Sequence, residues 1–309
     1  MKTSLVTTCW NERNTVEQWL GDVLNQSHAP DEVIIVDNFS SDGTYEYLLD
    51  QADKVRVMQL RCSVAQGRNQ AIRQATNEII VSTDMGTRLH QTWLEFLVKP
   101  FVDDPSIDVV AGNYEHVYPI KNSMSRADFY YRNPCRTRLV PGFLPSSRNI
   151  AYKQSVWEKI GGYQEGLKNA TDDTIFAHEI HHHGFKMALA PDSLVFWNRH
   201  ETLDGYLKET ARYAYGNGEA RIRRPFLTCH VSSAMYPWWK ACYASYALLR
   251  SGKAILRALK AHDPIMLVCL PHFVAMNALV FAEFYRKGYQ QEGDGLPGLR
   301  KRIQQLGLS

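Results

Sequence analysis

The sequence predicts an α/β protein: an αβα sandwich with a mostly parallel central sheet, followed by a helical C-terminal extension. One observation is that four short apolar runs alternate with segments of helical spacing in roughly the first ninety residues, a pattern typical of parallel sheets. Another is that two of these runs end in an acid, Asp37 and Asp84. Ligands of open α/β sheets bind at the carboxyl ends of the strands, so both acids are candidate site residues.

The first half supplies the first strands in order. Apolar residues at strand length predict strands over 5–9, 33–36, 55–60, 78–83 and 108–112. Helical spacing and N-cap residues predict helices that begin near Asn14, Ser41, Ser63 and Thr92.

The second half is less regular. Residues 115–147 are punctuated by prolines, and their aromatic and arginine content favours a binding region. Beyond them we expect a strand over 149–152, a helix over 155–160, and a helix that begins at Thr171 or Asp172 and ends at Gly184. Two short strands over 187–189 and 194–197 and a helix over 203–215 complete this part, with Gly216-Asn217-Gly218 as the stop signal.

Composition excludes several classes of protein. Of the 309 residues, 45% are hydrophobic and 22% are charged, which describes an ordinary globular chain. The net charge of +3 is too small to indicate nucleic-acid binding, and no nucleic acid is expected. The six cysteines form no C-x-x-C pair and suit a reducing cytoplasm. The polar N-terminus is expected to be a first strand rather than a signal peptide.

The C-terminal part differs in composition. No acid occurs between Glu219 and Asp263, whereas basic residues alternate with Trp and Tyr. This composition suits the anionic cytoplasmic face of a membrane. The apolar stretch 264–282 approaches spanning length, but Pro271, His272 and Asn277 interrupt it. We therefore expect peripheral membrane association of residues 221–309; a membrane span and a helical cap on the main domain are the alternatives.

Several short motifs occur in a fixed order. They are Trp10-Asn11-Glu12, Asp37 to Thr44 (D-x-x-S-x-D-G-T), Gly67-Arg68-Asn69, Asp84-Met85-Gly86, Thr171-Asp172-Asp173 and Arg212-Tyr213, with Glu209 three residues earlier. Over roughly residues 3 to 220, this series resembles the family 2 glycosyltransferases of the GT-A fold. The resemblance implies a catalytic domain over 1–220, with a nucleotide-binding half (1–112) and an acceptor and catalytic half (113–220).

The resemblance also implies a function. It implies an inverting transferase that moves a sugar from a nucleoside-diphosphate sugar to a saccharide or lipid-linked hydroxyl, in cell-surface polysaccharide or glycolipid synthesis. Asp173 is the implied general base, which must lie within hydrogen-bond reach of the acceptor proton. The implied nucleotide-sugar contacts are Asn11, Glu12, Asp37, Arg68 and Asp84, and the implied acceptor or diphosphate contacts are Asp172, Arg199 and Arg212.

One position departs from the family pattern. Gly86 stands where the last acid of D-x-D usually contacts the metal ion. A divalent cation, Mg²⁺ or Mn²⁺, is expected through Asp84 and the diphosphate, with His200 as a further candidate ligand. Alternatively, Arg199 or Arg212 offsets the diphosphate charge without a metal.

Two other functions compete with the transferase. Residues 178–182 spell H-E-x-x-H, with His178 and His182 on one helix face, as in zinc hydrolases. No third ligand follows at a typical spacing. The other alternative is a non-catalytic relative that binds nucleotide sugars, with Gly86 marking lost activity.

Overall fold

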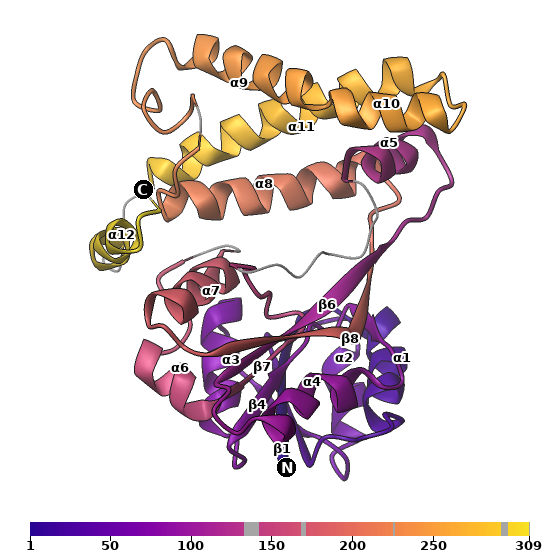
Figure 1. The fold of residues 1–309 in the computed structure, drawn as a ribbon, viewed down its shortest axis with the longest axis vertical. Helices are drawn as coiled ribbons and strands as arrows, with labels where there is room; N and C mark the ends of the chain where they lie inside the picture. Colours follow the sequence, from indigo (N-terminus) through magenta and orange to yellow (C-terminus); the bar gives the residue numbers. More distant parts are fainter. Residues whose placement is uncertain (133–141, 168–170, 225, 292–295, 309) are drawn as a thin grey trace. The chain divides into compact units, whose positions relative to one another are not determined.

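The computed structural model describes residues 1–132, 142–167, 171–224, 226–291 and 296–308. The chain divides into two compact units. Figure 1 shows the chain coloured from the N-terminus to the C-terminus. Unit 1 comprises Met1–Glu115, Arg136–Glu165 and Asp172–Trp197, and unit 2 comprises His116–Cys135, Gly166–Thr171 and Asn198–Ser309.

An eight-stranded sheet organises unit 1, and its strands follow the order β3-β2-β1-β4-β7-β6-β8-β5. Pairing is parallel from β3 to β4 and antiparallel in the β4–β7, β6–β7 and β5–β8 pairs. The predicted parallel sheet is therefore confirmed for the first four strands, and every antiparallel pair named above involves a later strand, β5 to β8. The strands are β1 (Thr3–Cys9), β2 (Glu32–Asp37), β3 (Arg56–Gln59), β4 (Ile79–Ser82), β5 (Thr87–Leu89), β6 (Val109–Val117), β7 (Ile150–Lys153) and β8 (Met187–Asn198).

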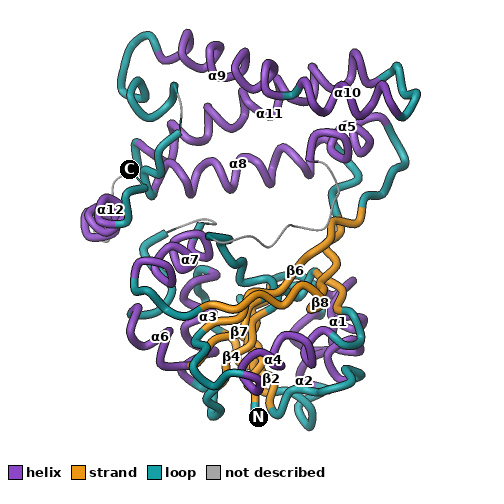
Figure 2. Tube along the Cα trace, in the orientation of Figure 1, coloured by secondary structure: helices purple, strands orange, loops and turns teal. Residues whose placement is uncertain are grey.

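Helices cover both faces of this sheet. Alternate residues of one strand enter two different cores: Leu5 packs in the cluster that holds Trp19 and Trp93, whereas Val6 packs in the cluster that holds Phe176. This alternation follows from the two-residue period of a strand. Figure 2 shows α3, α6 and α7 on one side of the strands and α1 and α2 on the other. The helices are α1 (Arg13–Leu24), α2 (Thr44–Leu49), α3 (Val64–Arg73), α4 (Trp93–Asp103), α6 (Gln154–Ile160) and α7 (Asp172–His182).

Local sequence explains where these helices begin. Ser63 caps α3 by accepting a hydrogen bond from the backbone of Gln66, whose side chain accepts one from Ser63 in return. This reciprocal capping box confirms the start predicted at Ser63.

The structure corrects three expectations. The two short strands predicted over 187–197 form one strand, β8. The segment expected to be irregular contains the end of β6 and helix α5 (Ser123–Arg132), while residues 133–141 lie outside the described part of the chain. The helix predicted to stop at Gly216 continues as α8 (Leu203–Glu219).

Close packing at two glycines explains why α8 extends beyond its predicted end. A Cβ at Gly218 would lie 2.0 Å from the backbone oxygen of Tyr285, and one at Gly288 would lie 2.1 Å from that of Tyr215. These glycines therefore allow the backbones of α8 and α11 to approach closely and do not end the helix. Unit 2 consists of α5, α8, α9 (Tyr236–Arg250), α10 (Gly252–Lys260), α11 (Met266–Tyr289) and α12 (Leu296–Gln305).

Helix α11 is the one described helix long and apolar enough to cross a membrane by length and composition, with a mean hydropathy of 1.7 over its best window. Only 28% of that window is buried. Its inward face, which includes Phe273 and Tyr285, packs in two apolar clusters of unit 2. Helix α11 therefore packs one face within unit 2 and leaves most of its apolar window exposed.

Candidate active site

Two motif loops are joined at the ends of β1 and β2. Asn11 donates its backbone N–H to Ser40 at 2.9 Å, and its side-chain oxygen accepts the backbone N–H of Ser41 at 2.9 Å. The backbone N–H of Glu12 donates to Thr44 at 2.9 Å. Asn11 has a φ of 55°, a left-handed conformation that asparagine tolerates better than most residues. The Trp10-Asn11-Glu12 turn and the segment after Asp37 therefore form one hydrogen-bonded surface.

Asp37 lies at the end of β2 and is fully buried. Its carboxylate accepts hydrogen bonds from the backbone N–H of Ser40 at 3.0 Å and from the side chain of Gln59 at 3.1 Å. The Cys9 thiol donates to it at 3.4 Å, and burial together with Asp37 raises the pKa of that thiol. Asp37 is thus rigidly held between the first two loops.

Arg68 joins two motifs that are distant in sequence. From α3, its Nη2 contacts Oδ1 of Asp84 at 2.9 Å, and its Nη1 contacts Oδ2 of Asp172 at 2.7 Å. Both carboxylates hold the pKa of Arg68 above its ordinary value, against the effect of burial. Burial raises the pKa of Asp172, and Arg68 opposes that shift. Helix α3, the loop after β4 and the start of α7 meet at this point. The predicted residues Arg68, Asp84 and Asp172 therefore lie in one site.

Asp173 follows in the first turn of α7. Its Oδ2 accepts a hydrogen bond from the hydroxyl of Ser146 at 3.3 Å. The carboxylate is partly exposed, whereas Asp172 is buried against Arg68. The two adjacent acids therefore have different environments: Asp172 is neutralised by an arginine, and Asp173 is held by a hydroxyl.

Arg148 completes this site and was not predicted. Its Nε lies 3.3 Å from Oδ2 of Asp84, and its guanidinium stacks over the ring of Trp197, 3.8 Å from the centroid. Each carboxylate oxygen of Asp84 therefore forms an ion pair with a different arginine. No motif marks Arg148; the only signal in the sequence was the arginine and aromatic content of the segment that precedes β7.

Gly86 faces the carboxylate of Glu12. A Cβ built on Gly86 would lie 3.7 Å from Oε1 of Glu12. The carboxylate of Glu12 therefore lies next to the position where the family pattern D-x-D has its second acid. Burial raises the pKa of Glu12, and the negative charges of Asp84 and Asp42 raise it further. Within the described residues, no group of three or more His, Cys, Asp or Glu side chains is arranged to hold a metal ion. Asp84 and Glu12 nevertheless offer two carboxylates, a set that suits a Mg²⁺-type ion carrying phosphate ligands.

Three predicted residues belong to unit 2. The buried guanidinium of Arg199 contacts Asp128 at 3.1 Å and Glu209 at 2.8 Å, whereas Arg212 is exposed. The Nε2 of His200 lies 3.6 Å from Glu209, and burial lowers the pKa of His200. The roles assigned to Arg199, His200 and Arg212 stay predictions.

The H-E-x-x-H string lies on α7. Glu179 is buried and its carboxylate lies 3.6 Å from the ring of His183, outside the string. Burial and the neighbouring His181 lower the pKa of His178, and His181 contacts the backbone oxygen of Phe143 at 2.9 Å. These histidines therefore interact with other groups and do not form a three-ligand cluster in the described chain.

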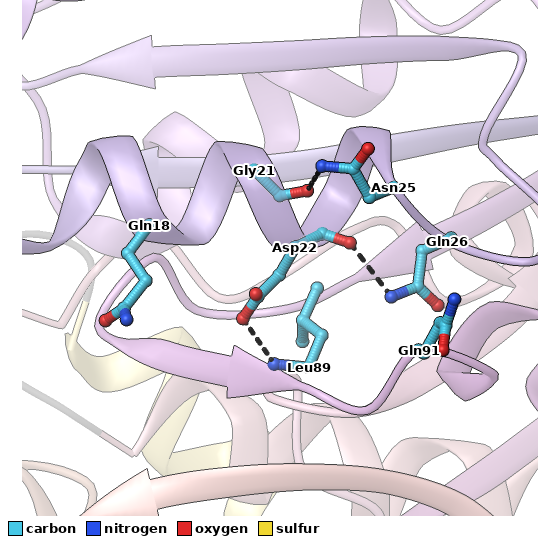
Figure 3. Close-up of a pocket in the computed structure, with 7 residues that line it drawn as sticks. All are labelled: Gln18, Gly21, Asp22, Asn25, Gln26, Leu89 and Gln91. Atoms are coloured by element: carbon cyan, nitrogen blue, oxygen red, sulfur yellow. Dashed lines mark hydrogen bonds between the residues drawn. The ribbon is translucent and has the colours of Figure 1, made fainter.

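A separate pocket of about 400 Å³ lies on α1 and β5, and Figure 3 shows its lining. Asp22 accepts the backbone N–H of Leu89 at 3.1 Å and pairs with Arg88 at 2.6 Å. The lining includes none of the predicted site residues. Its polar groups largely bond to one another, so we do not assign it to the site around Arg68.

Several known proteins are similar in sequence to this chain. A profile of the family described as "Glycosyltransferase like family 2" matches residues 2–216. Poly-beta-1,6-N-acetyl-D-glucosamine synthases from Staphylococcus aureus and Staphylococcus epidermidis are 25% and 23% identical over 230 residues, which is 71% of this chain. Only 55% of each synthase is covered, so the chain spans about half the length of these relatives.

Solved structures share the fold. A mannosyltransferase from Pyrobaculum calidifontis, in complex with GDP-Man and Mn²⁺, aligns with a TM-score of 0.61 and 20% identity over 94% of this chain and 88% of its own. Residues 1–349 of TarS from S. aureus align with a TM-score of 0.53 and 16% identity over 94% of this chain and 90% of theirs. The predicted GT-A fold is confirmed. The chain belongs to glycosyltransferase family 2.

Proposed function

We propose that this chain is an inverting glycosyltransferase. It moves a sugar from a nucleoside-diphosphate sugar to a hydroxyl of a saccharide or lipid-linked acceptor, in the synthesis of a cell-surface polysaccharide or glycolipid. The family assignment supports the reaction class, and the names of the staphylococcal relatives support the kind of product.

The observation that carries the proposal is the bridge made by Arg68. It brings the acid after β4, Asp84, into one site with the acids at the start of α7, 88 residues later in the chain. A transferase needs this combination, because the leaving diphosphate and the base must flank one anomeric carbon.

Asp173 is the general base. The acceptor oxygen attacks the anomeric carbon as its proton passes to the Asp173 carboxylate, and the bond from that carbon to the diphosphate oxygen breaks with its electron pair leaving on the diphosphate. One displacement of this kind inverts the configuration. Asp172 is less suited to the role, because Arg68 already neutralises it at 2.7 Å. Ser146 holds the Asp173 carboxylate in position.

On the donor side, Asn11, Glu12 and Asp37 contact the nucleoside, and Asp84 contacts the ribose. Arg68 and Arg148 place two cations on Asp84, and they contribute to binding of the negatively charged diphosphate. Guanidinium groups suit this task because they form strong charge-assisted hydrogen bonds with phosphate oxygens.

A divalent cation is consistent with this site, since the mannosyltransferase from Pyrobaculum calidifontis was solved with Mn²⁺. We propose that Mg²⁺ or Mn²⁺ is held by Asp84, with Glu12 beside Gly86 as the nearest second carboxylate. When bound, such an ion offsets the charge of the leaving diphosphate. His200 remains a candidate ligand.

The acceptor side and the cellular location complete the proposal. Asp172, Arg199 and Arg212 are assigned to the acceptor or the diphosphate. The protein acts on the cytoplasmic face of the cell membrane and associates with it peripherally through residues 221–309, whose basic and aromatic composition supports this location and a lipid-linked acceptor.

The decisive test replaces the base. A thermal-shift screen of nucleoside diphosphates and nucleotide sugars, with and without Mn²⁺, first identifies the donor. Asp173→Asn should then bind that donor within about twofold of wild type and lose transfer by a factor of about 10³ or more. The exposed Asp192→Asn serves as the control and should retain full turnover. Unchanged turnover in Asp173→Asn would refute the assignment of the base.

A further inference from the structure

Large apolar side chains are exposed together in one stretch of unit 2. Residues 249–268, here called the 249–268 surface, cover the end of α9, all of α10 and the start of α11. Exposed apolar residues that occur singly are ordinary, but a contiguous group marks an interaction site. The exposed large apolar residues of this surface are Leu249, Leu256, Leu259, Ile265, Leu267 and Val268, with 83% exposure at Leu249 and 76% at Val268.

Helix α10 shows that this exposure is built into the sequence. Its small residues Ala254 and Ala258 face inward and are buried in an apolar cluster of unit 2. Its larger residues Leu256 and Leu259 face outward. An amphipathic helix of a water-soluble protein normally buries its leucines. In α10, Ile255 packs partly against the inner cluster but both leucines face outward, so the outward leucines are expected to have an apolar neighbour outside this unit.

The charges of the same surface have one sign. Arg250, Lys253 and Lys260 are exposed among the apolar side chains. The single acid of the stretch, Asp263, is mostly buried and lies 3.6 Å from Arg126 of α5. The 249–268 surface therefore presents apolar side chains and cations without an unpaired acid.

The surface ends within the first turn of α11. Beyond Val268 the inward positions Leu270, Phe273 and Val274 are buried in the bundle, and the next exposed residue is the polar His272. Figure 1 shows α10 alongside α11 within this unit. Exposed apolar residues at the junction of three helices suit a shallow contact, about 5–10 Å deep, rather than a span of about 20 residues.

We propose that the 249–268 surface docks on an anionic lipid bilayer. The leucines, Ile265 and Val268 enter the boundary between headgroups and acyl chains, while Lys253 and Lys260 contact lipid phosphates. This inference rests on the proposed membrane location and identifies the residues that make the contact.

Charge favours lipid over a second copy of the chain. A symmetric contact between two such surfaces would place Arg250, Lys253 and Lys260 against the same cations of the partner, which is unfavourable. An anionic leaflet instead supplies opposite charge to each cation, and each cation near such a leaflet contributes favourably.

The test measures binding of the full chain to vesicles by flotation, with phosphatidylcholine vesicles and with vesicles that contain phosphatidylglycerol. Wild type should bind the anionic vesicles. Leu256→Glu/Leu259→Glu should reduce the partition coefficient about 30-fold or more, because two exposed leucines no longer enter the apolar layer. Lys253→Glu/Lys260→Glu should weaken binding to anionic vesicles, most strongly at low salt, and leave binding to neutral vesicles unchanged.

The matched control places the same change on unit 1. Leu49→Glu/Val102→Glu replaces two apolar side chains of comparable exposure and should bind vesicles like wild type. Leu249→Glu provides a second, single replacement at the most exposed position of the surface. Thermal unfolding and donor binding should be unchanged in all these variants, because the replaced side chains are exposed.

Three results would overturn the inference. One is equal vesicle binding by Leu256→Glu/Leu259→Glu and the control, which would move membrane contact elsewhere and leave the peripheral location intact. The second is a wild type that binds no vesicles. The third is a concentration-dependent dimer that Leu256→Glu/Leu259→Glu converts to monomer, which would assign the surface to a second copy. None of these results depends on transferase activity, so the failure of the proposed reaction is detected separately by the Asp173→Asn experiment.

Discussion

Replacing Arg68 by methionine removes the cation that lies between the carboxylates of Asp84 and Asp172. The side chains of Arg68 and Asp172 are 9% and 7% exposed, so this pair lies largely out of water. Removing one partner of such a pair costs about 3–5 kcal/mol, because the remaining charge stays buried without compensation. The second partner, Asp84, is 35% exposed, so its share is reduced by solvent screening.

The expected size of the effect is therefore large. For a domain of about 150–250 residues, 1 kcal/mol lowers the midpoint of thermal unfolding by about 2–4 °C, so Arg68→Met should lower the midpoint of unit 1 by about 6–20 °C. Arg73 offers a matched control on the same helix, because its pair with Glu165 is 3.4 Å long and half exposed. Arg73→Met should cost less than about 1 kcal/mol.

The pH dependence follows from Asp172. Its pKa is raised in the folded protein by burial, and removal of Arg68 should raise it further. An acid with a raised pKa takes up its proton more readily when folded, so stability falls as pH rises from the unfolded value through the folded one. The loss in Arg68→Met should therefore be greater at pH 8 than at pH 5.

Thermal unfolding by calorimetry or circular dichroism measures these effects. Adding Asp172→Asn to Arg68→Met should recover part of the stability, because the uncompensated charge is removed. The reasoning is refuted if Arg68→Met and Arg73→Met unfold at the same temperature, or if the loss does not depend on pH.

Three further predictions concern neighbouring charges. Glu12→Gln should stabilise the free protein at pH 8, because burial and the charge of Asp84 make the ionised form of Glu12 unfavourable there. The gain in stability should vanish near pH 4, where Glu12 is protonated, and calorimetry at both pH values measures it. Arg148→Met should weaken nucleoside-diphosphate binding about tenfold in titration calorimetry, and an unchanged affinity would exclude Arg148 from the donor site. Arg199→Met should lower stability by about 3–5 kcal/mol in chemical denaturation, against less than about 0.5 kcal/mol for the exposed Arg212→Met; equal losses would contradict the buried network.

Local patterns were sufficient for the first half of the fold. The strands β1, β2 and β4 are buried runs, whereas β3 is partly exposed, and helical period and capping residues such as Ser63 locate the helices between them. The same reasoning failed in α8, where Gly216 and Gly218 were interpreted as a stop. The role of Gly218 depends on the backbone of Tyr285, 67 residues further along the chain, and no local pattern contains that information.

The candidate site shows the same division. Motif order alone selected Arg68, Asp84, Asp172 and Asp173, and three of these side chains meet in one ion-pair network. Arg148 belongs to no motif, and it reaches Asp84 because β7 pairs antiparallel with β4 and brings its preceding segment to the same edge.

The sequence alone determined the family, the order of the first strands and helices, and the acid at the end of the fourth strand. Those features depend on apolar period, capping and motif order, which are properties of neighbouring residues. Tertiary structure decided that Asp172 is neutralised while Asp173 is not, that Glu12 faces Gly86, and that the leucines of α10 point outward. Each of these depends on which distant segments pack together, because burial and charge pairing are set by spatial neighbours.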